Sequence, residues 1–250
     1  MVCRQQISHV IQPGDNLYQL ARTYQTTIPA LLSLNPNIDP YNLQIGTVII
    51  ICPGENFITQ PGHPLPPACP NPEKPFSLRS SMRLVWLQHV YWTRMLLISI
   101  AERLKDQEPV TVRLLQNPAD IAHIFARFYA ADVARSITQL LTEHLQIGAD
   151  LITALRDQKT AQAESLNRQW HRNADEMAEA FSGINPYYNR AELRNMLYTH
   201  LELTSQEVAM RLAGNYTADI EAFSKVEQEA LTMAETFSSG LIQQFPQSFC

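Results

Sequence analysis

The chain has 250 residues, 45% of them hydrophobic, and a formal net charge of −5. Its length suits one or two globular domains, and its acidic balance gives no electrostatic case for binding nucleic acid. The most apolar run, residues 84–101, contains Gln88, His89 and Arg94, so we expect a buried helix there and no membrane span. The first ten residues lack a basic start followed by an apolar stretch, so no secretory signal is predicted.

Residues 9–53 predict a small α+β unit in the order strand, helix, helix, strand. A short β-favouring stretch ends at Pro13-Gly14. Asp15 is the expected cap of the first helix and Thr27 that of the second. The second strand is expected at 48–51, where consecutive β-branched residues can pair with the first strand.

The same stretch resembles the LysM module, a small βααβ carbohydrate-binding domain. The residues that carry the resemblance are Pro13, Gly14, Asp15, Asn16, Leu17, Leu20, Ala21, Tyr24, Thr26, Thr27, Leu31, Leu32, Asn35, Pro36, Leu43, Gly46, Val48, Ile49 and Ile50. Asn16 stands where the family usually has a small hydroxyl residue. The resemblance implies binding of polymers that contain N-acetylglucosamine, either peptidoglycan or chitin. In the family, the groove lies between the loop after the first strand and the loop before the last.

Carried onto this chain, the resemblance places the glycan-binding residues in those two loops. They are Gly14, Asp15, Asn16, Leu17, Asn37, Ile38, Asp39, Leu43, Gln44 and Ile45. Backbone groups near Gly14 and Gln44 suit the amide and hydroxyl groups of an acetamido sugar, while apolar side chains such as Leu43 suit its methyl group. The alternative is that Leu17 and Ile45 belong to the core. With one copy of the module, we expect weak binding.

The four cysteines, Cys3, Cys52, Cys69 and Cys250, lie outside the long predicted helices. Cys3 precedes the first strand of the small unit and Cys52 ends its last strand. Antiparallel pairing of those strands brings the two near each other, so a Cys3–Cys52 disulfide is a candidate. The cysteine spacings form no zinc pattern.

The sequence predicts three segments: a LysM-like domain at 1–53, a Pro-rich linker at 54–77 and an α-helical bundle at 78–250. Eight of the 16 prolines fall in residues 53–77. Because proline fixes the backbone and removes hydrogen-bond donors, this segment is expected to be an extended, semi-rigid spacer. A docking peptide for a proline-binding partner is the alternative.

From residue 78 onward, apolar residues recur at intervals of three and four, which indicates helices. The predicted helices are 79–105, 117–129, 131–157, 160–183, 189–213 and 215–243. Long helices with short connections predict an antiparallel bundle of four main helices with shorter pieces.

Polar residues fall on the predicted inner faces of these helices, and a plain apolar bundle does not need them. They are His89, His144, Asn173, His200, Glu207 and Glu227. In one interpretation, each histidine is satisfied separately within a polar network. In the other, His89, His144 and His200 converge with Glu207 on a metal or a small ligand. A short echo between residues 142–145 and 199–203 reflects either equivalent positions in two helical hairpins or chance.

The helical half resembles an uncharacterised family of bacterial helical domains that is often fused to LysM in spore-forming Gram-positive bacteria. The residues that carry this resemblance are 89–94, 113–118, 142–145, Trp170 with 173–175, and 243–246. The family has no activity to transfer, so no catalytic residue and no cofactor is predicted.

Together these features predict a non-enzymatic protein that attaches through LysM to peptidoglycan, in the cell wall or the spore cortex. The ligand or partner of its bundle is unassigned. The alternative is a metal-binding or enzymatic bundle that LysM targets to the wall. Without a secretory signal, a wall or spore-surface location implies synthesis in a mother cell, another export route or release by lysis.

Overall fold

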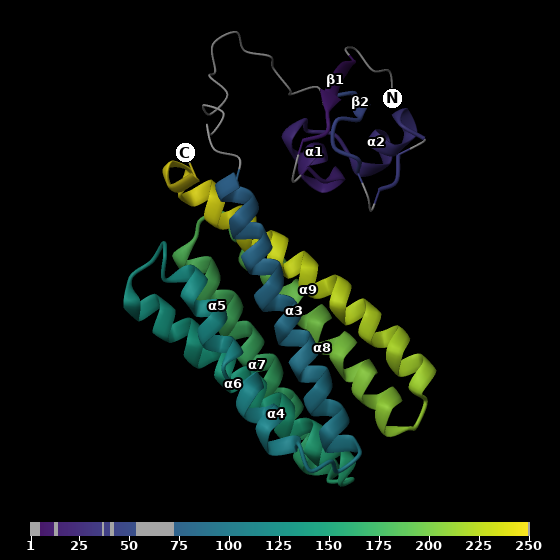
Figure 1. Ribbon diagram of the computed structural model, residues 1–250, viewed down its shortest axis with the longest axis vertical. Helices are drawn as coiled ribbons and strands as arrows, with labels where there is room; N and C mark the ends of the chain where they lie inside the picture. Colours follow the sequence, from purple (N-terminus) through teal and green to yellow (C-terminus); the bar gives the residue numbers. More distant parts are fainter. Residues whose placement is uncertain (1–5, 13–14, 37, 41–42, 54–72, 250) are drawn as a thin grey trace. The chain divides into compact units, whose positions relative to one another are not determined.

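The computed structural model describes residues 6–12, 15–36, 38–40, 43–53 and 73–249. It divides into two compact units, Met1–Pro70 and Asn71–Cys250 (Figure 1). The first unit is α+β and the second is helical, as the sequence predicts. No helix in the described ranges is long and apolar enough to cross a bilayer.

The N-terminal unit contains β1 (Ile7–Val10), α1 (Leu17–Thr23), α2 (Ile28–Leu34) and β2 (Val48–Ile51). β1 and β2 pair antiparallel, with Ile7 opposite Ile51 and Val10 opposite Val48. Along β2 exposed and buried residues alternate, so only one face of the sheet is covered. The predicted βααβ order is therefore confirmed.

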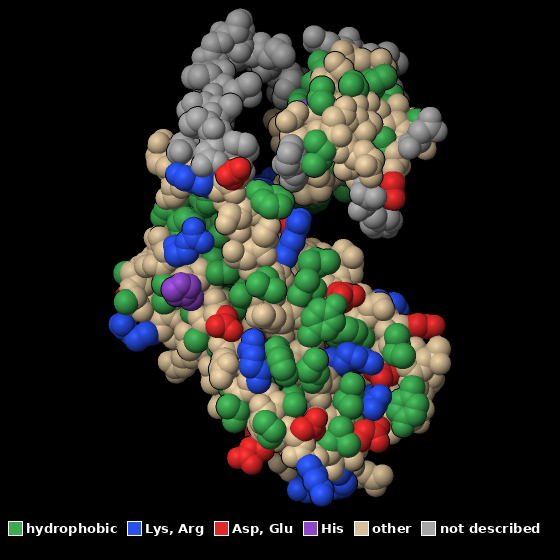
Figure 2. All heavy atoms as spheres, in the orientation of Figure 1, with side chains coloured by type: hydrophobic (Ala, Val, Ile, Leu, Met, Phe, Trp, Pro, Cys, Tyr) green, Lys and Arg blue, Asp and Glu red, His purple; other side chains and the backbone are tan. Residues whose placement is uncertain are grey.

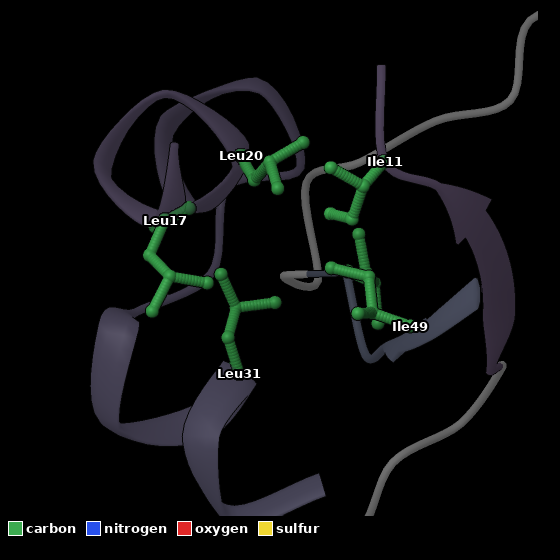
Figure 3. Packing of buried hydrophobic residues seen from close by; sticks show 7 residues of the cluster. Ile11, Leu17, Leu20, Leu31 and Ile49 are labelled. Carbon is green, nitrogen blue, oxygen red and sulfur yellow. The ribbon is translucent and has the colours of Figure 1, made fainter. Parts of the chain in front are cut away.

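A small apolar core lies between the two helices and this sheet (Figure 3). Its buried members are Ile11, Leu17, Leu20, Ala21, Leu31, Ile49 and Ile51. Burying one such aliphatic side chain stabilises a fold by about 1.5–3 kcal/mol. The periodic spacing of these residues along the sequence is what places them on one side of each element.

Side chains set the ends of the two short helices. Asn16 caps α1 by accepting a hydrogen bond from the Gln19 amide at 2.9 Å, and Thr27 caps α2 by accepting one from the Ala30 amide at 3.3 Å. Thr27 was the predicted cap. The cap predicted for α1 was wrong by one residue: the helix begins at Leu17, so the capping position is Asn16 and not Asp15.

The amide of Asn35, just after α2, acts as a strand partner for β2. Its Oδ1 accepts a hydrogen bond from the Ile50 amide at 2.8 Å, and its Nδ2 donates to the Ile50 carbonyl at 2.7 Å. These two bonds fix the end of α2 against the outer edge of the sheet.

The C-terminal unit consists of α3 (Glu73–Ala101), α4 (Gln107–Leu114), α5 (Asn117–Phe125), α6 (Ala131–Arg156), α7 (Thr160–Ile184), α8 (Arg190–Leu212), α9 (Tyr216–Gln244) and a short 3₁₀ turn, η1 (Pro246–Phe249). Helices adjacent in the sequence pack together, α6 on α7 and α8 on α9, and α3 also packs on α9. On the face seen in Figure 2, positive and negative side chains are interspersed over this unit.

The predicted helix ends at 105 and 129 lie beyond the observed ends of α3 and α5, at Ala101 and Phe125. The starts of two helices were also missed, and proline is the reason in both cases. α3 begins at Glu73, inside the predicted linker, with Pro75 in its first turn. α4 was not predicted, and it carries Pro109 in its first turn. The first turn of a helix leaves its N–H groups without intrahelical partners, so proline is tolerated there and was misread as a break.

Candidate functional site

The first loop of the N-terminal unit is held by Asp15. Its Oδ2 accepts a hydrogen bond from the Gln12 amide at 2.7 Å and lies 2.6 Å from His9 Nε2. The other nitrogen of the His9 ring lies 2.9 Å from the Tyr24 hydroxyl. This chain of polar contacts joins β1, the loop and the end of α1. Asp15 therefore fixes the loop, whatever it contributes to a ligand.

Two further predicted contact residues of this loop have structural tasks. The side-chain oxygen of Asn16 accepts the hydrogen bond that caps α1. Leu17 is only 4% exposed and lies in the core beside Leu20 and Leu31. Leu17 is therefore a core residue that packs under the loop, which is the alternative that the sequence left open.

The second loop presents the exposed apolar residue. Ile45 is 67% exposed, so it is not core. Ile38 and Leu43 are half-buried and pack against the core, whereas Asp39 and Gln44 are exposed. Gly14 and Asn37, the remaining predicted contact residues, lie outside the described residues.

Backbone hydrogen bonds bring the ends of the two loops together. The Ile11 amide donates to the Thr47 carbonyl, and the Gly46 amide donates to the Ile11 carbonyl, both at 2.8 Å. Gly46 has φ +85°, a left-handed conformation that favours glycine. The exposed residues Gln44 and Ile45 thus stand beside the point where the first loop leaves β1.

Cys52, just after β2, is disulfide-bonded. Its predicted partner Cys3 lies outside the described residues, so the Cys3–Cys52 pairing stays a prediction.

In the bundle, the structure brings His89, His144 and His200 to one point. They come from α3, α6 and α8, and each is at most 4% exposed. The ring centroids form a nearly equilateral triangle with sides of 6.0, 5.8 and 5.9 Å. One nitrogen of each ring lies within 4.8 Å of those of the other two.

Each histidine has one oxygen-bearing partner on a different helix. His89 Nδ1 lies 2.9 Å from Asn117 Oδ1 on α5, and His144 Nδ1 lies 3.2 Å from Asn173 Oδ1 on α7. His200 Nδ1 lies 3.5 Å from Glu229 Oε2 on α9, a distance longer than an ordinary hydrogen bond. Six helices therefore contribute to one cluster.

Burial determines the charge of two of these rings, His89 and His144. It lowers the pKa of His89 from its ordinary value to about 4, with the neighbouring His200 lowering it further and Asn117 opposing. The pKa of His144 is lowered well below its ordinary value, again chiefly by burial and then by the other two histidines. His89 and His144 are therefore neutral at pH 7.

Glu207 does not join the histidines, because an arginine engages it. Arg94 Nη1 donates to Glu207 Oε1 at 2.6 Å and to Asp219 Oδ1 at 2.8 Å. Arg211 lies 3.4 Å from the same aspartate. Burial raises the pKa of Glu207 to about 7 against the lowering effect of Arg94. Glu227, also predicted to point inward, instead accepts a hydrogen bond from the Tyr91 hydroxyl in an exposed contact.

A small cavity of about 20 Å³ adjoins the three rings. Apolar residues form most of its wall, and its remaining lining includes Thr93, Thr204 and Trp170. The buried Thr204 Oγ1 and Trp170 Nε1 have no hydrogen-bond partner within the described ranges. A cavity of this size has room for about one water molecule.

The cluster is built from three similar helical hairpins, a repeat that the sequence contains and the short echo only hinted at. The partners Asn117, Asn173 and Glu229 follow one another at intervals of 56 residues. Eight residues after each comes a phenylalanine, and these three rings, Phe125, Phe181 and Phe237, pack together with centroids 4.6–5.9 Å apart. Between partner and phenylalanine, every hairpin has an Ile-Ala or Met-Ala pair. The 56-residue period is the signal in the sequence that indicates Asn117 and Glu229, as equivalents of Asn173. The apolar spacing within a single helix does not indicate them.

The βααβ topology, the sheet with one covered face and the two adjoining loops define a small α+β module. Residues 9–51 match the family model of the LysM domain. No curated protein and no solved structure matches the chain. The family match thus covers the N-terminal unit and leaves the bundle to be interpreted from its own residues.

Proposed function

We propose that this chain is a glycan-binding protein that attaches through residues 9–51 to polymers containing N-acetylglucosamine. Peptidoglycan of the cell wall or spore cortex is the proposed ligand, and the bundle is the part that becomes attached. The single observation that carries the proposal is the LysM match. The loop geometry supports it, because both loops meet at β1 with exposed groups beside the meeting point.

The proposed contacts are fewer than those first predicted. Ile45, with 67% of its surface exposed, supplies the apolar patch for the acetamido methyl group, and Gln44 lies beside it. Asp15 and Asn16 shape the loop through bonds that they make within the protein. A few polar groups around one apolar contact suit a sugar ring. One short groove gives weak binding, so retention on an insoluble glycan relies on its many repeated sites.

Sedimentation with purified peptidoglycan tests the proposal. The full chain should appear in the pellet with sacculi, and Ile45→Ala should move a large share of it to the supernatant, because truncation removes the exposed contact. Ile50→Ala is the matched control: the same residue type, 42% exposed, but on β2 and outside the loops. It should sediment like the wild type.

Two outcomes would contradict this function. The first is a full chain that stays in the supernatant with both peptidoglycan and chitin. The second is loss of sedimentation by Ile45→Ala and Ile50→Ala alike, which would place binding outside the two loops. A preference for chitin beads over sacculi would retain the glycan class and replace peptidoglycan as the ligand.

A further inference from the structure

The partners of the histidines fix which ring nitrogen is available. Asn117 Nδ2 donates to the Val85 carbonyl at 2.8 Å, so its Oδ1 must face His89. Because that oxygen only accepts, His89 Nδ1 carries the proton and Nε2 keeps its lone pair. In the second hairpin, Asn173 Nδ2 donates to the Leu140 carbonyl at 3.1 Å with the same consequence. Metal-binding histidines characteristically donate their other N–H to an oxygen in this way.

The spacing of the rings is close to that around a metal ion. Three imidazoles on a tetrahedral zinc, each with a Zn–N bond of about 2.0–2.1 Å, have their nitrogens about 3.3–3.4 Å apart. Here one nitrogen of each ring lies within 4.8 Å of one nitrogen of each of the other two. Movement of each ring by less than about 1 Å toward the common centre closes the difference.

The charges around the cluster favour a cation. Glu229 is 8% exposed, and neither of its carboxylate oxygens has a hydrogen-bond partner among the described residues. Burying an uncompensated carboxylate is costly. Its nearest cationic candidate is the ring of His200, 3.5 Å away. A divalent cation on the other side of that ring strengthens its N–H as a donor to Glu229 and supplies the missing positive charge.

The donor set selects the class of metal. Three neutral imidazole nitrogens suit zinc and its transition-metal neighbours, whereas magnesium and calcium prefer oxygen ligands. Three histidines also leave one tetrahedral position for water or a small anion. The cavity beside the rings has room of about 20 Å³ and offers the hydroxyl of Thr204 and the N–H of Trp170 to such a ligand.

We propose that His89, His144 and His200 bind one Zn²⁺ ion through their Nε2 atoms, with Asn117, Asn173 and Glu229 holding the rings. The fourth coordination position faces the cavity and takes water or a small anion. This site goes beyond the proposed glycan function and is independent of it. Its glutamate is Glu229, not the Glu207 that the sequence suggested.

Metal content of the purified full chain tests the site. After incubation with Zn²⁺ and desalting, one equivalent should remain by elemental analysis, and Zn²⁺ should raise the thermal unfolding temperature. His200→Gln should lose both effects. His123→Gln, which changes an exposed histidine on α5, is the matched control and should retain both. In Glu229→Gln the ligands remain but the charge is lost, so Zn²⁺ should bind about 10- to 100-fold more weakly.

Cobalt substitution separates this site from binding by the cysteines. Co²⁺ at three nitrogens and one oxygen should give the visible bands of a tetrahedral ion without the near-ultraviolet band of a cobalt–thiolate bond. Circular dichroism confirms that each variant keeps its helices, and Glu229→Gln decides the matter if His200→Gln unfolds. The proposal is overturned if no Zn²⁺ or Co²⁺ is retained, if a thiolate spectrum appears, or if folded His200→Gln or Glu229→Gln binds Zn²⁺ as tightly as the control.

Discussion

Gly240 in α9 lies directly under the ring of Tyr188, and alanine at this position should destabilise the bundle. A Cβ placed there would be 1.9 Å from Tyr188 Cε1, about 1.5 Å inside the nearest ordinary contact of 3.4 Å. The ring has little freedom to withdraw: Tyr188 is 4% exposed, and its hydroxyl donates to the Phe237 carbonyl at 2.6 Å.

The size of the effect follows from three contributions. Overpacking a core costs about 1–3 kcal/mol, and losing the buried hydroxyl bond costs about 1–3 kcal/mol. Replacing glycine by alanine within a helix returns about 1 kcal/mol. Gly240→Ala should therefore lower the free energy of unfolding by about 1–5 kcal/mol, measured by urea denaturation followed through helical circular dichroism.

Gly183 in α7 provides the control, because a Cβ there meets no atom within 4 Å. Gly183→Ala should leave the unfolding free energy unchanged or raise it by up to about 1 kcal/mol. In a double-mutant cycle, Tyr188→Leu should cost less in the Gly240→Ala background than in the wild type, because there it also removes the ring that clashes with the new Cβ. A Gly240→Ala protein as stable as Gly183→Ala would refute the close packing of Tyr188 on α9.

Asp15→Ala should loosen the N-terminal unit by about 1–3 kcal/mol, because it removes the acceptor shared by His9 and a backbone amide. Hydrogen exchange should quicken in residues 6–53 and not in the bundle, and unchanged protection there would contradict the role of Asp15. Glu207→Gln should make the bundle more sensitive to acid. Lowering the pH from 7 to 5 costs stability at His89 and His144, whose pKa values are lowered in the fold, so that the unfolded chain binds more protons. Glu207 has a raised pKa of about 7 and opposes this loss, because in the fold it takes up its proton before the unfolded chain does. In Glu207→Gln, the free energy of unfolding should fall by about 2 kcal/mol more between pH 7 and pH 5 than it does in the wild type. An equal fall in the two proteins would exclude the raised pKa of Glu207.

The sequence predicts the N-terminal unit well because its determinants are local. The Thr27 cap and the apolar spacing of Leu17, Leu20 and Leu31 each act within a few residues. The same spacing could not decide whether Leu17 faces a ligand or the core, since both surfaces attract leucine. Only the packed core shows it to be buried.

In the bundle, the long helices followed from periodicity, whereas the level at which they meet did not. Three histidines that point inward can lie at the same level along the bundle axis or at three different levels. The pattern within each helix does not decide between the two. The sequence indicated Glu207 and Glu227 and missed Glu229 for a related reason. Residues two apart on a helix point to nearly opposite sides, so a small error in the assumed phase selects the wrong carboxylate. The 56-residue period carries the missing information, because equivalent positions in repeated hairpins lie at equivalent heights.

The hairpin repeat has a consequence for the order in which the chain matures. Each hairpin contributes one phenylalanine to the packed trio, and Phe237 on α9 is the last of the three to leave the ribosome. Until then the side chains of Phe125 and Phe181 lack the ring that completes their packing. A nascent chain that pauses after its second hairpin therefore exposes apolar surface that is prone to aggregation. Truncation before α9 should give an insoluble product and not a smaller folded bundle.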